Sequence, residues 1–197
     1  MEDQVFNELI SPDSRCNAFH IDPQGLSERL GEINLSVNLP KEVSNQLQAC
    51  KKLCLYTYFV YEFATIAQDL SFLAIETALK ERLRLFYPDG IEFKTKIDGT
   101  VKKEKPLSLS HFQALLTNKN LKIQKIDAFF EKGVLLGDLI EWSISKDILN
   151  ERFNGEGDVV KDLRNAVAHP IGQTIVSPWS AIHGLSLNVQ LINSLFK

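Results

Sequence analysis

The sequence predicts a mainly α-helical bundle with a small β-hairpin insertion and an irregular N-terminal appendage. Two observations support this fold class. No glycine or proline, the strongest helix breakers, interrupts residues 41–87, so this stretch is expected to be helical. Residues 91–97 alternate between apolar and polar side chains and lead into Asp98-Gly99, which is the sequence pattern of a β-hairpin.

Length and composition are those of one globular domain. The chain has 197 residues, of which 44% are hydrophobic and 24% are charged, and these values are ordinary for a folded protein. Its formal net charge is −3. Because such a chain has no overall basic field, tight sequence-independent binding to a nucleic-acid backbone is not expected. Any nucleic acid must therefore be bound at a local site.

The sequence predicts a cytoplasmic protein without membrane segments. The N-terminal residues lack a basic stretch followed by an apolar run, and no apolar stretch reaches about 18 residues, so neither a signal peptide nor a membrane span is expected. The three cysteines, Cys16, Cys50 and Cys54, are few and odd in number, as is usual in a reducing compartment. No further Cys or His lies close to Cys50 and Cys54, so we expect structural thiols and neither a metal site nor a cofactor.

Residues 1–39 are predicted to form an appendage that packs on a helical domain of residues 40–197. Prolines and glycines interrupt the appendage, and no long hydrophobic period runs through it. Within it, residues 33–39 alternate between apolar and polar side chains, which predicts a short strand.

The uninterrupted stretch of residues 41–87 is expected to form two helices that separate near Leu53–Tyr56. Apolar residues recur in its second part at spacings of three, four and seven: Phe59, Phe63, Ile66, Leu70, Leu73, Ala74, Ala78 and Leu85. With its other apolar residues, this part is apolar on nearly every side. It is therefore predicted to be the central buried helix.

The predicted β-hairpin insertion spans about residues 91–105. It is rich in lysine, with Lys94, Lys96, Lys102, Lys103 and Lys105. Exposed lysines commonly protect a strand edge from pairing with another chain. A surface that follows the phosphates of RNA is the second interpretation.

Four further helices are expected towards the C terminus. They span residues 110 to about 117, 126–150, 158 to about 168, and 178 to about 196. The first begins with Ser110–Gln113, which fits a capping box, and the last begins with Ser177 as N-cap and Pro178 at the first position. The inner face of the last helix is expected to carry Ile182, Leu185, Val189, Ile192 and Phe196.

The helix expected at residues 158–168 carries the side chains that indicate a catalytic function. At about 100° per residue, Val160, Leu163 and Val167 form its apolar stripe. The adjoining arc of about 140° contains Arg164, Ala168, Lys161, Asn165 and His169. Because residues five apart are not neighbours on a helix, a site that uses both Arg164 and His169 needs a long reach by the arginine or a second copy of the motif.

The stretch Arg164-Asn165-Ala166-Val167-Ala168-His169 resembles the signature of the HEPN superfamily, in which an arginine is followed by a polar residue and, a few residues later, by a histidine. The order of the expected helices in residues 40–197 is also similar to that family. The segment Ala74–Lys80, which contains Glu76, resembles the acidic segment that many HEPN proteins place near their motif.

The resemblance implies a metal-independent endoribonuclease that acts as a homodimer with two motifs brought together. In that chemistry a ribose 2′-hydroxyl attacks the neighbouring phosphate and leaves a 2′,3′-cyclic phosphate and a 5′-hydroxyl. His169 would transfer protons near neutral pH, and Arg164 would stabilise the charge that grows on the phosphate. Asn165 would orient the phosphate or the facing motif, Glu76 would hold Arg164, and Lys161 would contact RNA.

Two classes of function remain open from the sequence. Such domains often serve as toxins or in phage defence, which would imply tRNA or other cellular RNA as substrate and an antitoxin as partner. The alternative is a non-catalytic helical module that dimerises or regulates another protein. In that case Arg164 and His169 would only cap and stabilise their helix.

Overall fold

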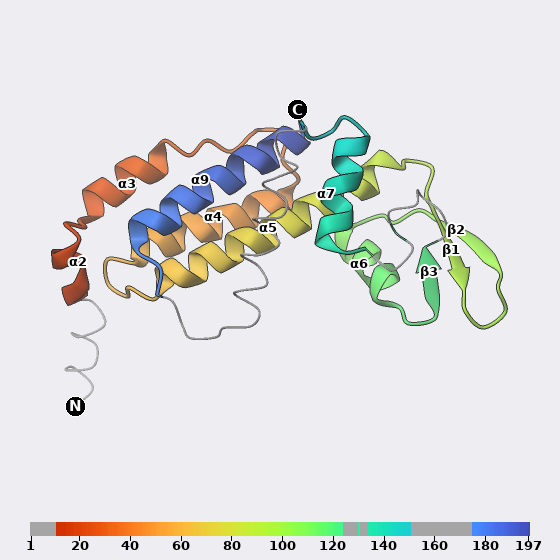
Figure 1. The fold of residues 1–197 in the computed structure, drawn as a ribbon, viewed down its shortest axis with the longest axis horizontal. Helices are drawn as coiled ribbons and strands as arrows, with labels where there is room; N and C mark the ends of the chain where they lie inside the picture. Colours follow the sequence, from red (N-terminus) through yellow and green to blue (C-terminus); the bar gives the residue numbers. More distant parts are fainter. Residues whose placement is uncertain (1–10, 124–129, 131–133, 151–174) are drawn as a thin grey trace. The chain divides into compact units, whose positions relative to one another are not determined.

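The computed structural model describes residues 11–123, 130, 134–150 and 175–197. Within these residues the chain is mainly α-helical and contains one small antiparallel sheet (Figure 1), which confirms the predicted fold class at this level. None of the described helices is both long and apolar enough to cross a membrane.

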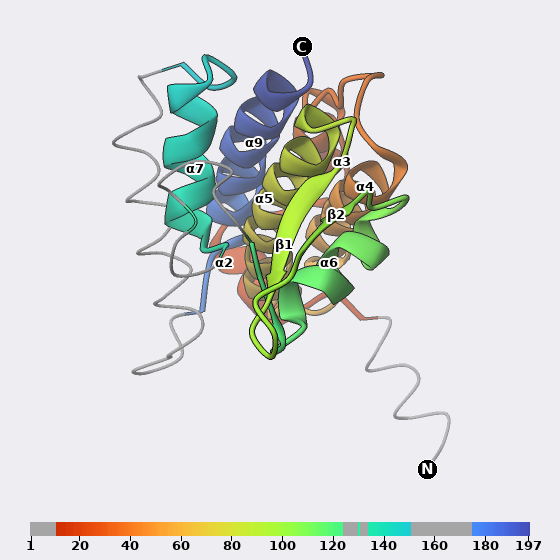
Figure 2. The same ribbon diagram turned by 90° about the vertical axis from the view of Figure 1, so that its right-hand side faces the viewer.

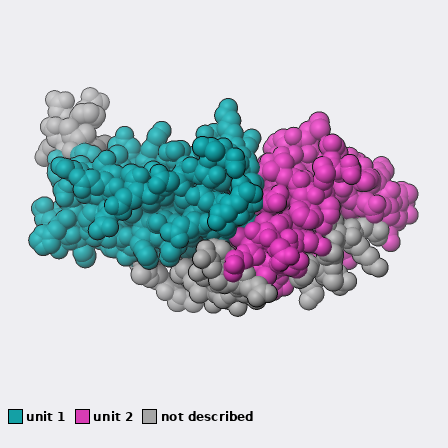
Figure 3. Space-filling view, turned by 90° about the horizontal axis from the view of Figure 1, so that it is seen from above, with its two compact units in different colours: residues 1–75, 163–197 teal, residues 76–162 magenta. Residues whose placement is uncertain are grey.

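The chain divides into two compact units, which Figure 3 shows in different colours. Unit 1 comprises residues 1–75 and 163–197, and unit 2 comprises residues 76–162. Helix α5 (Phe63–Phe86) contributes residues to both units.

Unit 1 is a layer of helices drawn from both ends of the chain. Its described helices are α2 (Ser14–Ala18), α3 (Pro23–Gly31), α4 (Lys41–Tyr56), the first part of α5, and α9 (Pro178–Leu195). Helix α4 packs against both α3 and α9, and α9 runs alongside α4 and α5 in Figure 1 and Figure 2. The N-terminal and C-terminal segments therefore share one core.

Helices α4 and α5 confirm the predicted division of residues 41–87, because α4 ends at Tyr56 and α5 begins at Phe63. The prediction that α5 is buried on nearly every side is wrong, since Ile66, Leu73 and Leu85 are each close to half exposed. In unit 1 the fully buried positions of α5 are mostly small residues: Ala64, Ala67, Ser71 and Ala74, together with Ile75. Small side chains let neighbouring helices approach closely, so here the buried stripe follows size and not hydrophobicity alone.

The C-terminal helix α9 agrees with the prediction at its start and along its inner face. Ser177 is the N-cap, its hydroxyl accepts a hydrogen bond from the backbone N–H of Ser180, and Pro178 occupies the first position. All five residues expected on the inner face are buried: Ile182, Leu185, Val189, Ile192 and Phe196. Local capping signals and the 3.6-residue period were sufficient to predict this helix.

A buried polar side chain of α9 is hydrogen-bonded to α5 within unit 1. The Nδ2 atom of Asn188 donates to Oγ of Ser71 at 2.7 Å, and that hydroxyl donates to the backbone oxygen of Gln68 at 2.7 Å. Asn188 is 5% exposed and Ser71 is fully buried. Because a buried amide without a partner is costly, this pair disfavours any other rotation or register of α9 on α5.

The predicted strand at residues 33–39 is wrong, since the structure assigns no strand there. The backbone of this segment pairs instead with a side chain of α9. Ser36 donates its N–H to Oδ1 of Asn193 at 3.0 Å, and Nδ2 of Asn193 donates to the backbone oxygen of Asn34 at 2.8 Å. One amide group thus replaces the donor and acceptor of a neighbouring strand.

The described part of the N-terminal appendage is less irregular than predicted, because it contains α2 and α3. Asp22 caps α3 by accepting a hydrogen bond from the N–H of Gly25 at 2.8 Å, and Pro23 occupies the first helical turn. These are favourable residues for a helix start. The appendage contributes buried apolar residues to unit 1: Cys16, Ile21, Leu26, Leu30, Ile33 and Leu39.

Unit 2 contains the predicted hairpin as part of a three-stranded sheet. Its strands are β1 (Ile91–Thr95), β2 (Val101–Glu104) and β3 (Leu121–Ile123), in the order β2-β1-β3. The turn at Asp98-Gly99 is confirmed, and Gly99 has a φ of 72°, a conformation that favours glycine. Strand β3 was not predicted, because three residues are too few to show a period.

Helix α6 (Leu109–Thr117) ends where the sequence indicated but begins earlier. Its N-cap is Ser108, whose hydroxyl accepts a hydrogen bond from the N–H of His111 at 3.1 Å. The predicted capping box at Ser110 is therefore wrong, because Ser110 already lies inside the helix.

Helix α7 (Leu136–Ser145) is shorter than the predicted helix of residues 126–150. Residues 134 and 135 are not helical, and Leu135 has the extended backbone of an N-cap. Beyond the other end, Asp147 has a positive φ of 56°, which ends helical geometry. The helix predicted at residues 158–168 lies outside the described residues.

An aromatic cluster forms the core of unit 2. Trp142 of α7 is fully buried, and its ring centroid lies 5.3 Å from that of Phe86 and 6.4 Å from that of Phe130. Ile91 and Phe93 of β1 are also buried. One face of β1 therefore packs in the core, and its polar residues lie on the opposite face.

We predict that Asn188→Ala lowers the free energy of unfolding by about 1–3 kcal/mol, because it removes a buried hydrogen bond between α9 and α5. Urea denaturation followed by circular dichroism would measure this change. Asn45→Ala is the matched control, since Asn45 is exposed on α4 and should change stability by less than about 0.5 kcal/mol. Equal effects of the two substitutions would contradict the role assigned to Asn188.

Candidate functional site

Arg164, Asn165 and His169, together with Lys161, lie outside the described residues. Their proposed roles therefore stay predictions from the sequence. The structure does place Glu76 and the lysines of the hairpin.

Glu76 lies on α5 and forms an ion pair with Lys80 one turn later. Nζ of Lys80 lies 2.7 Å from Oε1 of Glu76, and the two side chains are 19% and 16% exposed. Pairs at this spacing are natural neighbours on a helix and stabilise it by a few tenths of a kcal/mol. The carboxylate is thus held by Lys80 in a mostly buried position, and the role of holding Arg164 stays a prediction.

The register of the sheet divides the predicted RNA-binding lysines between its two faces. Lys94 lies on the face of β1 opposite to buried Phe93, whereas Lys102 pairs with Phe93 and shares its face. Lys103 pairs with Glu92 and lies on the same face as Lys94. The four lysines Lys94, Lys96, Lys102 and Lys103 are all exposed.

Strand β3 adds a lysine that the sequence analysis missed. Lys122 is the direct cross-strand partner of Lys94, so the two side chains stand next to each other on one face. Lys96 follows β1, and its N–H donates to the backbone oxygen of Asn120 at 2.8 Å, which continues the pairing. Lys96 lies just beyond the end of β1 and borders the same surface hollow as Lys122.

Asp98, the acidic residue at the hairpin turn, is hydrogen-bonded within its own loop. The carboxylate of Asp98 accepts hydrogen bonds from the hydroxyls of Thr95 and Thr100 and from the N–H of Thr100. These bonds, that from Thr95 most of all, lower the pKa of Asp98 to about 2. Within the described part of the chain, no ion pair includes Lys94, Lys96 or Lys122.

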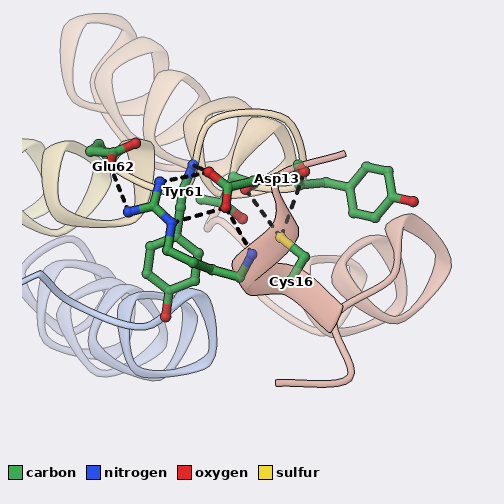
Figure 4. Close-up of polar contacts among 7 residues, drawn as sticks. Asp13, Cys16, Tyr61 and Glu62 are labelled. Carbon is green, nitrogen blue, oxygen red and sulfur yellow. Dashed lines mark hydrogen bonds and ion pairs between the residues drawn. The ribbon is translucent and has the colours of Figure 1, made fainter. Parts of the chain in front are cut away.

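A second charged cluster lies in unit 1, where the N-terminal segment meets the connection between α4 and α5 (Figure 4). Arg15 forms two hydrogen bonds with Asp13, at 2.9 and 2.6 Å, and an ion pair with Glu62 at 2.7 Å. Its guanidinium also lies 4.7 Å from the ring centroid of Tyr61. The hydrogen bond from Arg15 is the main cause that lowers the pKa of Asp13 to about 2.

This Arg15 cluster is a structural clamp and not an open site. Around it, Asp13 donates its backbone N–H to the oxygen of Tyr58 at 2.8 Å, and Sγ of Cys16 lies 3.6 Å from the backbone oxygens of Thr57 and Tyr58. The charged groups are therefore directed at one another, and the thiol is directed at backbone oxygens. The sequence analysis missed the cluster, because the partners are separated by more than 40 residues and carry no motif.

The three cysteines behave as core residues. Cys16, Cys50 and Cys54 are fully buried and free. Burial raises the pKa of the Cys50 and Cys54 thiols to about 12 in each case. At neutral pH these two thiols are protonated, which makes them poor nucleophiles and poor metal ligands and fits the predicted structural role.

Comparison with known proteins adds no relative: the chain matches no family model, no curated protein and no solved structure. The HEPN resemblance therefore rests on the motif residues and the expected order of helices.

We predict that the contribution of Asp13 to stability disappears in acid. Its pKa is about 2 in the folded protein and 3.8 as the reference value, so the ionised form stabilises the fold above about pH 4, and this stabilisation is lost as the pH falls towards 2. Asp13→Asn should be less stable than the unchanged protein at pH 7, and the difference in Tm should shrink between pH 4 and pH 2. Asp89→Asn, at an exposed position of unit 2, is the control. A difference in Tm for Asp13→Asn that does not vary with pH would refute the prediction.

Proposed function

We propose that this protein is a metal-independent endoribonuclease of HEPN type. The observation that carries the proposal is the motif Arg164-Asn165-x-x-x-His169, followed directly by Pro170. Arginine and histidine are the residue types that this reaction needs, because one stabilises a phosphate and the other exchanges a proton near neutral pH.

The reaction begins with attack of a ribose 2′-hydroxyl on the adjacent phosphate. The bond to the 5′-oxygen of the next nucleotide breaks, which leaves a 2′,3′-cyclic phosphate and a 5′-hydroxyl. Arg164 offers paired donors to the phosphate oxygens as their charge increases. His169, which precedes proline and so is expected at a helix C terminus, is favoured in its protonated form and suits protonation of the leaving oxygen.

A homodimer would supply the second proton-transfer group. One His169 takes the proton of the attacking hydroxyl while the partner's His169 protonates the leaving oxygen, and Asn165 orients the phosphate. Glu76 is the residue proposed to hold Arg164 in position. The helix order is consistent with this arrangement, since α5 carries Glu76 and α9 closes the chain after the motif.

The biological role that fits such an activity is that of a cytoplasmic toxin or a phage-defence nuclease. Its substrates would be tRNA or other cellular RNA, and its activity would need control by an antitoxin or another regulatory protein.

We predict that the purified protein cleaves total cellular RNA in excess EDTA. The 3′ ends that cleavage creates should resist tailing until dilute acid opens the cyclic phosphate and a phosphatase removes the resulting monoester. His169→Ala and Arg164→Ala should each reduce the cleavage rate by at least about 100-fold, as is usual when a group that transfers protons or stabilises the phosphate is removed.

His111→Ala is the matched control, because His111 is an exposed histidine at the start of α6. It should cleave RNA at the rate of the unchanged protein. Full activity of either motif variant would refute the proposal. An absence of cleavage by the unchanged protein, together with dimer formation, would favour the non-catalytic interaction module instead.

A further inference from the structure

The sheet region is basic although the whole chain is acidic. Residues 91–123 contain seven lysines and three acidic residues, so this segment carries a net charge of +4 within a protein of net charge −3. A charge asymmetry of this kind is typical of a surface that binds an anionic polymer.

Protection of the sheet edge explains only part of this charge. Lys102 and Lys103 lie on β2, which is an edge strand, and lysines on an edge prevent pairing with another chain. Lys94 lies on β1, the central strand, where there is no free edge to protect. A different explanation is therefore needed for Lys94.

The pairing of Lys94 with Lys122 has a cost in stability. The two residues are directly opposite each other on β1 and β3, and like charges at such positions destabilise a sheet. By contrast, Lys103 stands opposite Glu92, which is a favourable pair. Positions that reduce stability without a structural benefit are frequently functional.

Lys96 extends this charge beyond the pair. It directly follows β1, continues the pairing with β3 through its N–H, and borders the same surface hollow as Lys122. The three lysines, which we call the lysine face, thus follow the β1–β3 ladder to its end. The carboxylate of Asp98 is held at the turn by hydrogen bonds from threonines, and within the described residues it forms no ion pair with these lysines.

We propose that the lysine face, formed by Lys94, Lys96 and Lys122, binds the phosphate backbone of RNA. Ammonium groups on long flexible side chains are suited to phosphates that have no fixed position. The aromatic residue of these strands, Phe93, is buried, so bases have no ring to stack on, and binding depends on phosphate and not on sequence. The choice of RNA as the anionic polymer rests on the proposed function.

A lipid surface is disfavoured by the hairpin tip. Ile97 is 82% exposed there, but it directly precedes Asp98, whose pKa of about 2 keeps the carboxylate charged at neutral pH. A charged carboxylate next to the apolar residue opposes insertion of the tip into a bilayer.

The test measures binding without cleavage. Its probe is a fluorescein-labelled single-stranded 2′-O-methyl RNA, which lacks the attacking hydroxyl, and fluorescence anisotropy is followed from low to high salt. The triple variant Lys94→Gln, Lys96→Gln, Lys122→Gln should bind roughly 100-fold more weakly at 0.1 M salt than the unchanged protein. The slope of log K against log salt should fall by about 2, because each phosphate contact contributes about 0.7.

A second triple variant, Lys41→Gln, Lys52→Gln, Lys197→Gln, makes the same change in net charge at exposed positions of unit 1. It should keep the affinity and the salt slope. The single variant Lys122→Glu places an opposite charge beside Lys94, so it should raise the Tm while weakening RNA binding.

An unchanged salt slope in the lysine-face triple variant, or equal losses in both triple variants, would overturn the proposal. Binding to vesicles of phosphatidylserine and phosphatidylcholine without binding to RNA would overturn it as well. Lysine-dependent binding without any cleavage of unmodified RNA would support the lysine face while refuting the proposed nuclease. Cleavage without lysine-dependent binding would support the proposed nuclease and refute the lysine face.

Discussion

The buried amide of Asn188 is the constraint on which unit 1 depends. Its hydrogen bond to Ser71 fixes the rotation of α9 against α5, because any other rotation would bury an amide without a partner. That rotation directs the apolar residues of α9 into the core and presents Asn193 to the N-terminal segment, where it pairs with the backbone of Asn34 and Ser36. Asn188 and Asn193 thus determine how α9 packs on α5 and how Asn34 and Ser36 are held against α9.

The N-terminal segment is held at several further points along its length. Near its start, Arg15 links Asp13 to Glu62, and further along Lys51 of α4 donates to the backbone oxygen of Ile33 at 3.0 Å. Each contact is modest, since a partly exposed ion pair contributes little by itself. Their spacing along the segment matters more, because a chain fixed at many points must be released at all of them before it can detach. Burial of its apolar side chains supplies the remaining energy.

Features with a local cause could be predicted from the sequence, and features that depend on distant partners could not. Ser177-Pro178 and Asp98-Gly99 determine a helix start and a turn through their own backbone preferences, and both are found. The alternation at residues 33–39 was misleading, because the backbone oxygen of Asn34 and the N–H of Ser36 are paired with the side chain of Asn193 and not with a strand. For the candidate site, the exposure of Lys94 followed from the strand period, but Lys122 became recognisable only through the register of β3. The roles of Arg164 and His169 rest on the motif alone.

The net charge of −3 and an RNA-binding surface are compatible because electrostatic fields in salt are local. At physiological ionic strength, charges separated by more than about 8 Å are largely screened. A phosphate close to Lys94 and Lys122 therefore interacts mainly with the sheet region of net charge +4, and only weakly with the acidic remainder of the chain. The same screening limits the strength of binding, so the lysine face would retain RNA briefly and release it readily. Brief retention is what an enzyme needs if it must exchange its product for new substrate, whereas a storage protein would need the opposite.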